Sequence, residues 1–455
     1  MGFYGKAFPA CLGDLGRTLR HPAAWDVGAL TVGQYLAAGL GLLTTIVAAR
    51  LLGPSGYGRA ALILAYPALL LSLGSFKAIT VSTRYLAGFR RTGRREEFRA
   101  ICKIAYGIDV AAFLGVFLTV LLTGGWVAEY VYASPDLYGL MVLYAASFPF
   151  LAFRGNSYAV LTAFEEFRML SMLYVLGGGM TLVLVTGFLA LGYGVRGMIA
   201  GMALSHVMIG LITLAVATAL MIRRDIGAWW SGSLTSIRSL RKELVSFFGW
   251  NYLMTTLSGM LAQVPVMFLG RMRGAEEAGF FRLAMSVTNI AGYPQSAAGR
   301  VVYPWLSGRW AETKDRESIR VSVIRWTVRG GLPLGVAILL LVPALPFVVP
   351  LVFGEEYQPM VPGAQVLLLG GAAGALFFWL VPYHYATGRV AFWTKRFAVY
   401  TALALGFGLV SVQWWGFWGI AIVFGVGRIT FSVWMARQAV RGNAAGLGVE
   451  ETGGK

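Results

Sequence analysis

The stretch VGALTVGQYLAAGLGLLTTIVAA, residues Val27–Ala49, contains no charged side chain. An α-helix needs about 20 mostly apolar residues to cross the hydrocarbon core of a bilayer. Because no water is available there to pair with backbone polar groups, such a stretch must be helical. Further runs without Asp, Glu, Lys or Arg lie at 169–195, 197–222, 244–270, 330–354, 357–388 and 397–427. The sequence therefore predicts an all-α polytopic membrane protein.

The composition supports this class. Only 13% of the 455 residues are charged and 57% are hydrophobic, whereas a soluble domain is usually about one quarter charged. The net charge is +18, which in a soluble protein would favour nucleic-acid binding. In a membrane protein, Lys and Arg instead act as topology signals. We therefore expect no nucleic-acid partner, and we expect the bilayer to be the main environment.

The charge pattern predicts about twelve transmembrane helices and their orientation. We place the spans at 27–49, 59–83, 104–124, 137–164, 169–192, 196–221, 244–270, 279–304, 328–350, 360–387, 393–412 and 415–437. Lys and Arg gather before the first span and in the even-numbered loops. The third, ninth and eleventh loops contain neither residue. The positive-inside rule then places both termini in the cytoplasm.

The chain also contains an internal repeat. Three segments of the first half recur in order in the second half, displaced by 221, 220 and 222 residues. The paired segments begin at Gly53 and Gly274 (GPSGYG, GAEEAG), at Tyr85 and Trp305, and at Gly194 and Gly416. Each repeat has an even number of spans, so we expect two six-helix lobes related by an axis along the membrane normal, with substrate bound between them.

These boundaries divide the chain into four parts. Residues 1–221 form the N-terminal lobe with its N-terminal segment, and residues 244–438 form the C-terminal lobe. Between them, 222–243 is an expected amphipathic cytoplasmic linker, because Leu234, Ile237, Leu240 and Leu244 recur at helical spacing. Residues 439–455 form a short polar tail.

Several of these motifs resemble those of a known family. The run ARLLGPSGYGRAALI (Ala49–Ile63), the segment STRYLAG (Ser82–Gly88) and GYGVRGMIAG (Gly192–Gly201) resemble the multidrug/oligosaccharidyl-lipid/polysaccharide (MOP) flippase superfamily. They are most similar to its polysaccharide-export branch, the Wzx-like oligosaccharide flippases. The resemblance implies a V-shaped, MATE-like fold with alternating access. It also implies a polyprenyl-diphosphate-linked glycan as substrate, location in a prokaryotic cytoplasmic (inner) membrane, and polysaccharide-assembly proteins as possible partners.

Cations inside the predicted spans are the candidate substrate-binding residues. An unpaired Lys or Arg at the bilayer centre costs roughly 2.5–3.5 kcal/mol on insertion scales, so we expect these side chains to face a water-filled cavity. The alternative is that they extend to the interfaces. The set comprises Lys77, Arg154, Arg300 and Arg428 within spans, Arg59 and Arg282 at span ends, and His206, which aligns with Arg428 in the repeat.

Other polar residues have weaker predicted roles. His206 is also interpretable as a packed, hydrogen-bonded core residue. Asp109 and Asn251 are possible ion-coupling residues, and Asp109 has the alternative role of pairing with Lys103 or Arg99. No spacing indicates a metal site, a cofactor site or catalytic residues, so we expect a protein that is not an enzyme.

A cationic cavity selects an anion, because phosphate oxygens accept charge-assisted hydrogen bonds from Arg. We therefore predict a flippase for a lipid-linked oligosaccharide in polysaccharide, O-antigen or lipopolysaccharide export. The alternatives are a lipid II or teichoic-type precursor flippase and, from another class, a membrane glycosyltransferase or polymerase. Lipid II flippases of the superfamily typically carry two further C-terminal helices, which favours the first reading for a chain that ends at Lys455.

Overall fold

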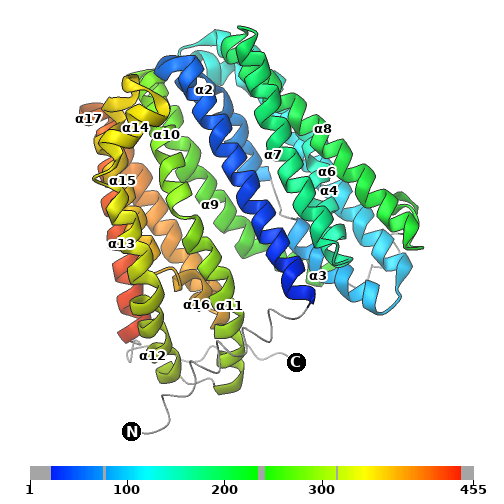
Figure 1. Cartoon of the computed structure of the whole chain (residues 1–455). Helices are drawn as coiled ribbons and strands as arrows, with labels where there is room; N and C mark the ends of the chain where they lie inside the picture. Colours follow the sequence, from blue (N-terminus) through cyan, green and yellow to red (C-terminus); the bar gives the residue numbers. More distant parts are fainter. Residues whose placement is uncertain (1–21, 75–77, 234–240, 314–315, 442–455) are drawn as a thin grey trace. The chain divides into compact units, whose positions relative to one another are not determined.

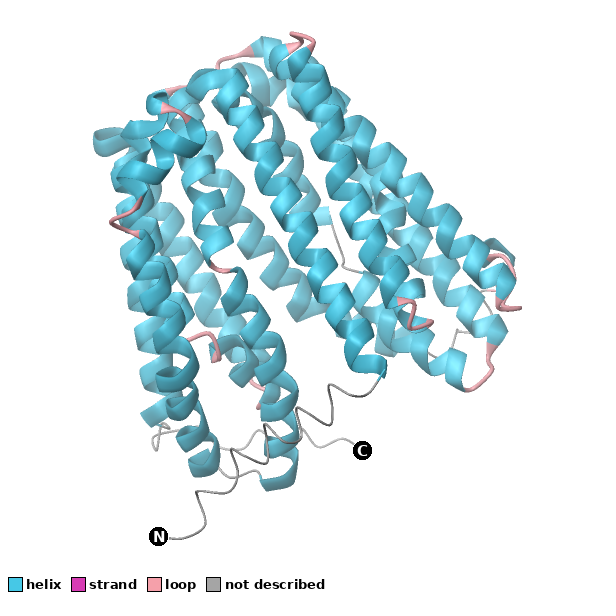
Figure 2. Ribbon diagram, viewed as in Figure 1, coloured by secondary structure: helices cyan, strands magenta, loops and turns pink. Residues whose placement is uncertain are grey.

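The computed structural model describes residues 22–74, 78–233, 241–313 and 316–441, and within these ranges it is almost entirely helical (Figures 1 and 2). The chain divides into two compact units, Met1–Thr256 and Leu257–Lys455. The boundary falls inside one long helix, α9 (Arg241–Arg273). Each unit is described separately below.

Unit 1 is a bundle of long helices. Its helices are α2 (Pro22–Gly74), α3 (Ala78–Arg91), α4 (Arg95–Trp126), α5 (Tyr138–Ala145), α6 (Phe148–Ala163), α7 (Phe167–Ala190), α8 (Gly194–Arg223) and the start of α9. Short turns of helix η1 (Val127–Val131), η2 (Pro135–Leu137) and η3 (Trp229–Ser231) join them. Helix α8 packs against both α6 and α7, and α6 also contacts α3 and α4.

Small residues allow the helices of unit 1 to approach closely. A Cβ atom added to Gly210 of α8 would lie 2.1 Å from the carbonyl oxygen of Phe150 on α6. One added to Gly201 would lie 2.8 Å from the backbone nitrogen of Val185 on α7. Only glycine fits at such backbone contacts, which are common where membrane helices pack.

Unit 2 contains the remainder of α9 and eight further helices. They are α10 (Ala275–Ala291), α11 (Tyr293–Thr313), α12 (Arg316–Trp326), α13 (Leu332–Leu341), α14 (Leu345–Phe353), α15 (Val361–Leu376), α16 (Leu380–Ala386) and α17 (Val390–Arg441), with short turns η5 (Thr327–Gly331) and η6 (Glu355–Met360). Helix α15 is central, because it packs against α10, α13 and α17. Helix α11 packs against α16.

Nine helices in the described ranges are long and apolar enough to cross a membrane. Two of the nine each contain a break that separates two predicted spans: α2 turns at Gly53 (φ 65°) and α17 turns at Gly416 (φ 54°). The predicted span 279–304 is also helical but is divided between α10 and α11. Seven of the nine helices therefore each correspond to one predicted span, and α2 and α17 each correspond to two. The α10–α11 pair corresponds to the one remaining predicted span.

The glycines at the repeated motifs share an unusual backbone conformation. Gly53 and Gly274 have φ values of 65° and 93°, and Gly194 and Gly416 both have 54°. Positive φ is readily adopted only by glycine. The sequence repeat thus places glycine where the chain changes direction in both units.

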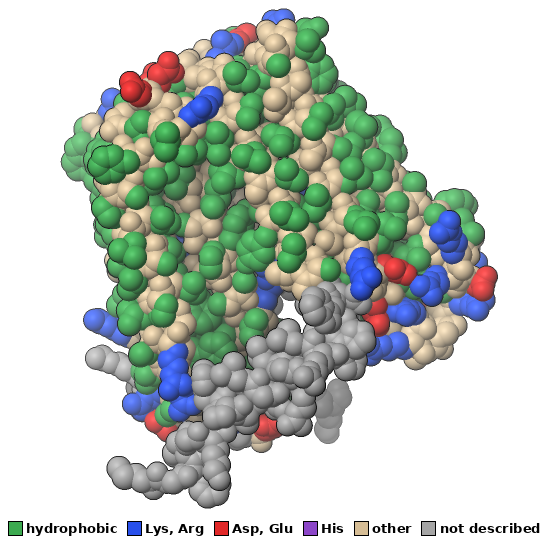
Figure 3. All heavy atoms as spheres, viewed as in Figure 1, with side chains coloured by type: hydrophobic (Ala, Val, Ile, Leu, Met, Phe, Trp, Pro, Cys, Tyr) green, Lys and Arg blue, Asp and Glu red, His purple; other side chains and the backbone are tan. Residues whose placement is uncertain are grey.

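The surface has the character expected of a membrane protein. Large apolar side chains such as Leu122, Phe347 and Leu351 are more than 70% exposed. Figure 3 shows hydrophobic side chains over the middle of the helices and Lys and Arg side chains gathered near helix ends. Such apolar exposure is unfavourable in water and is expected where helices face lipid.

The segment predicted as an amphipathic linker is only partly described. Residues 234–240, which contain Leu234, Ile237 and Leu240, lie outside the described residues. The preceding part is not helical along its length: after α8, the chain runs through η3, and α9 begins at Arg241.

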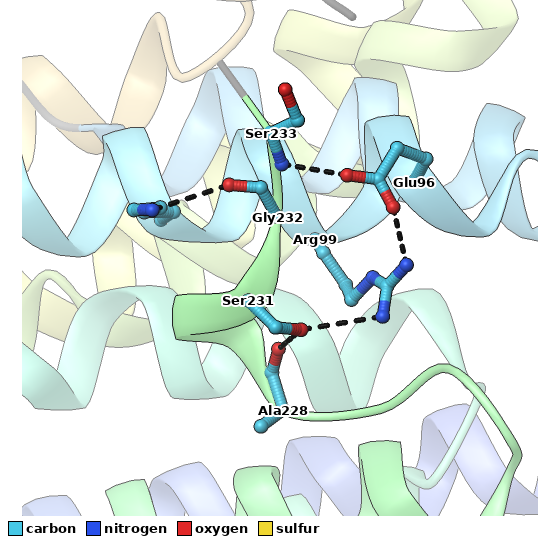
Figure 4. A network of polar contacts seen from close by, with 7 residues as sticks. Glu96, Arg99, Ala228, Ser231, Gly232 and Ser233 are labelled. Atoms are coloured by element: carbon cyan, nitrogen blue, oxygen red, sulfur yellow. Dashed lines mark hydrogen bonds and ion pairs between the residues drawn. The ribbon is translucent and has the colours of Figure 1, made fainter.

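Residues Ser231–Ser233 of the linker are hydrogen-bonded to α4 (Figure 4). The Arg99 guanidinium donates a hydrogen bond to Ser231 Oγ at 3.2 Å and also pairs with Glu96. The Glu96 carboxylate accepts a hydrogen bond from the Ser233 backbone N–H at 2.6 Å, and Lys103 Nζ donates to the Gly232 carbonyl oxygen at 3.2 Å. The charged side chains of Glu96, Arg99 and Lys103 on α4 therefore hold this part of the linker in place.

Candidate functional site

A cavity of about 430 Å³ lies inside unit 2, between α9, α10, α15 and α17. Aromatic side chains form much of its wall, and Ser258, Asn289 and Gln295 add polar groups. The aromatic residues are Phe377, Phe378, Trp393, Phe397, Tyr400, Phe424 and Phe431. Arg428 of α17 is the one charged residue among the residues that line it. We refer to this space as the Arg428 cavity.

The guanidinium group of Arg428 lies against the backbone of Gly374 on α15. A Cβ atom added to Gly374 would be 2.9 Å from Arg428 Nη2 and 3.0 Å from Nε. The side chain has no hydrogen-bond or ion-pair partner among the described residues. A guanidinium carries five N–H donors, so Arg428 can offer several of them to an anion in the cavity.

A second cavity, of about 450 Å³, adjoins the first. Arg300 of α11 lines it together with Tyr303 and Tyr385. The two cavities share Gln295, Phe378 and Val381 in their walls. The fold of unit 2 therefore brings Arg300 and Arg428, which are 128 positions apart in the sequence, to neighbouring cavities.

In unit 1, Arg154 and His206 come from facing helices, α6 and α8. Arg154 is exposed and lies near enough to His206 and Tyr158 to influence both electrostatically. His206 Nδ1 is 3.2 Å from Ser147 Oγ, and that hydroxyl is 2.7 Å from the Tyr144 carbonyl oxygen. Because Ser147 donates its single proton to the carbonyl, His206 Nδ1–H donates to Ser147. His206 is therefore hydrogen-bonded and packed beside Tyr144.

The two cations predicted at span ends both have protein partners. Arg59 forms an ion pair with Asp136 of η2. Arg282 Nη1 donates a hydrogen bond to Gln263 Oε1 at 3.1 Å. The counter-charge of Arg59 is Asp136, which lies in the third loop between predicted spans. The sequence contains a signal for this ion pair, because Asp136 is an acidic residue in a loop that has no Lys or Arg of its own.

Two predicted site residues are not placed. Lys77 lies outside the described residues. The backbone of Asn251 belongs to α9, but its side chain also lies outside the described part of the structure. Their roles in substrate binding and ion coupling therefore remain predictions.

Asp109 is buried in unit 1 at the junction of α3, α4 and α6. Asn156 Nδ2 donates a hydrogen bond to Asp109 Oδ2 at 2.8 Å, and Ser82 Oγ donates to Asn156 Oδ1 at 2.9 Å. The alternative pairing of Asp109 with Arg99 or Lys103 is wrong, because those cations bind Glu96 and the η3 segment instead (Figure 4). The hydrogen-bond partner of the Asp109 carboxyl group is thus a neutral amide.

No cluster suitable for a metal ion occurs in the part of the chain that the structure describes. The cavity residues of unit 2 are instead the cations Arg300 and Arg428, together with aromatic and amide side chains. Such a set can bind an anionic, partly apolar molecule.

A sequence-family model described as polysaccharide biosynthesis protein matches residues 24–310. The chain belongs to this polysaccharide biosynthesis protein family. No curated protein sequence matches this family member significantly.

Solved structures resemble this polysaccharide biosynthesis family member over most of its length. An inward-facing multidrug resistance MATE transporter of the MOP superfamily is 16% identical, with a TM-score of 0.74, over 92% of this chain and 100% of that one. The lipid II flippase MurJ in an inward closed conformation is 12% identical, with a TM-score of 0.70, over 90% and 87%. A MOP superfamily transporter from Pyrococcus furiosus, with a binding pocket of reversed polarity, is 16% identical, with a TM-score of 0.64, over 92% and 96%.

At these identities the likeness defines the fold. The family member shares the all-α fold of these transporters, which confirms the predicted fold class, and the matching family model agrees with the predicted resemblance to polysaccharide-export proteins. The orientation of its termini stays a prediction.

Proposed function

We propose that this protein is a flippase that moves an anionic lipid-linked glycan across a prokaryotic cytoplasmic membrane. The Arg428 cavity is the main support. Its guanidinium has no hydrogen-bond or ion-pair partner among the described residues, and a diphosphate offers several acceptor oxygens of the kind that Arg binds well. The family description, polysaccharide biosynthesis, agrees with a glycan substrate.

The aromatic wall also suits a sugar. Phe377, Trp393 and Phe397 line the Arg428 cavity together with Asn289 and Gln295, so aromatic rings and amide groups share its wall. Binding sites commonly combine an apolar wall with a few placed polar groups that set orientation. Arg300, in the adjoining cavity, supplies a second cation for a bulky anionic ligand.

The proposal includes a mechanism and a topology. Two six-helix lobes, 1–221 and 244–438, alternate access to the substrate, with both termini in the cytoplasm. Arg300 and Arg428 are the proposed phosphate-binding residues of unit 2, and Arg154 and Lys77 are those of unit 1. Asp109 is the proposed ion-coupling residue. An inside-negative potential favours outward movement of negative charge by about 2.3 kcal/mol per charge per 100 mV.

The likeness to MurJ supports a lipid II or teichoic-type precursor as a second candidate substrate. All of these carry a polyprenyl diphosphate, so they share the chemistry that Arg428 would bind. The candidate substrates differ in the glycan that this diphosphate carries.

The direct test is reconstitution of the purified protein in liposomes that contain a polyprenyl-diphosphate-linked glycan labelled on its sugar. We expect the protein to expose the label to an impermeant enzyme faster than protein-free liposomes do. Parallel liposomes with lipid II and with a cationic dye test the alternative substrates. Unchanged exposure of every lipid-linked glycan would refute the proposal, and a chemically altered glycan would instead indicate a glycosyltransferase or polymerase.

A further inference from the structure

A long apolar groove lies between the two arms of α17 in unit 2. Its volume is about 590 Å³, and its wall is apolar apart from Arg396, Tyr400 and Thr430. The remaining lining residues are Val399, Leu403, Ala404, Phe407, Ile422, Val423, Val426, Gly427, Phe431 and Trp434. Several of them are strongly exposed, including Leu403 at 54% and Phe407 at 64%. We refer to this feature as the α17 groove.

The α17 groove has one charged end. The Arg396 guanidinium carbon lies 5.2 Å from the centre of the Trp434 ring and 5.1 Å from that of Phe392. The Trp434 contact bridges the two arms, whereas Phe392 lies on the same arm as Arg396, and both contacts hold the cation beside an aromatic ring. Towards the break at Gly416, the groove is lined by Phe407 and Ile422 and carries no charge.

Two aromatic rings lie where the α17 groove and the Arg428 cavity meet. Tyr400 and Phe431 line both spaces. Their rings are stacked, with centroids 4.9 Å apart and an angle of 26° between planes. Gly427 leaves room for this pair, since a Cβ atom there would be 3.2 Å from Tyr400 Cε2.

We propose that the α17 groove binds the polyisoprenoid chain of the lipid-linked substrate while its diphosphate occupies the Arg428 cavity. This inference rests on the proposed function. A polyisoprenoid diphosphate is one apolar chain joined to one anionic head, and unit 2 offers an apolar groove and a cationic cavity that share a single wall. Tyr400 and Phe431 then stand where the chain joins the diphosphate.

Photo-crosslinking tests what occupies the α17 groove. A benzoylphenylalanine placed at Leu403 should capture polyisoprenoid diphosphate in cells that make the lipid-linked glycan, as identified by the mass of the adduct. The matched control position is Leu340 of α13, which is 68% exposed and lies outside the groove. Adducts of phospholipid only at position 403, or equal polyisoprenoid capture at both positions, would overturn the inference.

Transport by a groove-filling variant provides the second test. Val426 is 52% exposed and lines the groove, whereas Val336 of α13 is 44% exposed and does not. Filling an apolar site changes selectivity by roughly tenfold or more, so Val426→Trp should slow flipping of the long-chain substrate by about tenfold. It should leave a short-chain analogue with the same glycan nearly unaffected, and Val336→Trp should behave like the wild type with both.

The possible failures have different meanings. If the wild type flips neither substrate, the proposed function is wrong. If the wild type flips the long-chain substrate and Val426→Trp does so equally well, the groove does not hold the chain. If Val426→Trp does not fold, as judged by size-exclusion chromatography, the crosslinking result at Leu403 decides.

Discussion

Replacing Arg428 with alanine is the most informative perturbation of the proposed site. The guanidinium has no protein partner among the described residues, so its removal breaks no hydrogen bond or ion pair there and the fold should persist. With substrate bound, the variant loses hydrogen bonds to a charged group, which contribute roughly 1.5–3 kcal/mol. Since each 1.4 kcal/mol is a factor of ten, substrate affinity should fall by about 10- to 150-fold.

The assay is flipping of the lipid-linked glycan in proteoliposomes, measured over a range of substrate densities. Arg428→Lys should retain part of the activity, because the charge stays but the planar fork is lost. Arg437→Ala is the matched control, since Arg437 is an exposed arginine on the same helix and does not line the cavity. Wild-type affinity and rate for Arg428→Ala at normal expression would refute phosphate binding by this residue.

Three further predictions concern packing, coupling and topology. Gly210→Ala should destabilise the protein by about 1–3 kcal/mol, because the added methyl group overpacks against α6. Gly187→Ala is the control, since nothing lies within 4 Å of the added Cβ. Thermal unfolding in detergent compares the two variants, and equal melting temperatures would contradict the packing argument. Asp109→Asn keeps a hydrogen-bond acceptor for Asn156, so the fold should persist. The substitution should remove any dependence of transport on an ion gradient, and an unchanged dependence would exclude Asp109 as the coupling residue. A single cysteine at Pro135 should react with an impermeant reagent outside intact cells, and one at Gly93 only after permeabilisation; the reverse pattern would invert the predicted orientation.

Much of the candidate site could be proposed from sequence because charged residues are rare in these spans. Arg428 and Arg300 stood out for that reason alone, and the structure places both at cavities of unit 2. Their surroundings were not predictable. The aromatic wall of the Arg428 cavity comes from α17 and from the connection between α15 and α16. Aromatic residues within a span look alike in sequence whether they face lipid, a neighbouring helix or a cavity.

The partners of Arg59 and Asp109 were likewise not predictable from the sequence. Arg59 looked equivalent to the cavity cations, yet it pairs with Asp136, 77 residues away. Asp109 looked close to Arg99 and Lys103 in sequence, but its partner is Asn156 of another helix. Spacing along one helix says which residues share a face, whereas an ion pair between helices depends on which faces meet.

The sequence by itself determined that this is a helical membrane protein with a repeated architecture. Uncharged runs of about 20 residues can satisfy their backbone in lipid only as helices, and the glycines of the repeat, Gly53 and Gly274, permit positive φ at corresponding turns. These are local properties, which each segment carries alone. Only the tertiary structure decided that Arg428 lies against Gly374 without a hydrogen-bond or ion-pair partner among the described residues, and that Tyr400 and Phe431 line both a cationic cavity and an apolar groove. Those arrangements depend on how helices from distant parts of the chain pack together.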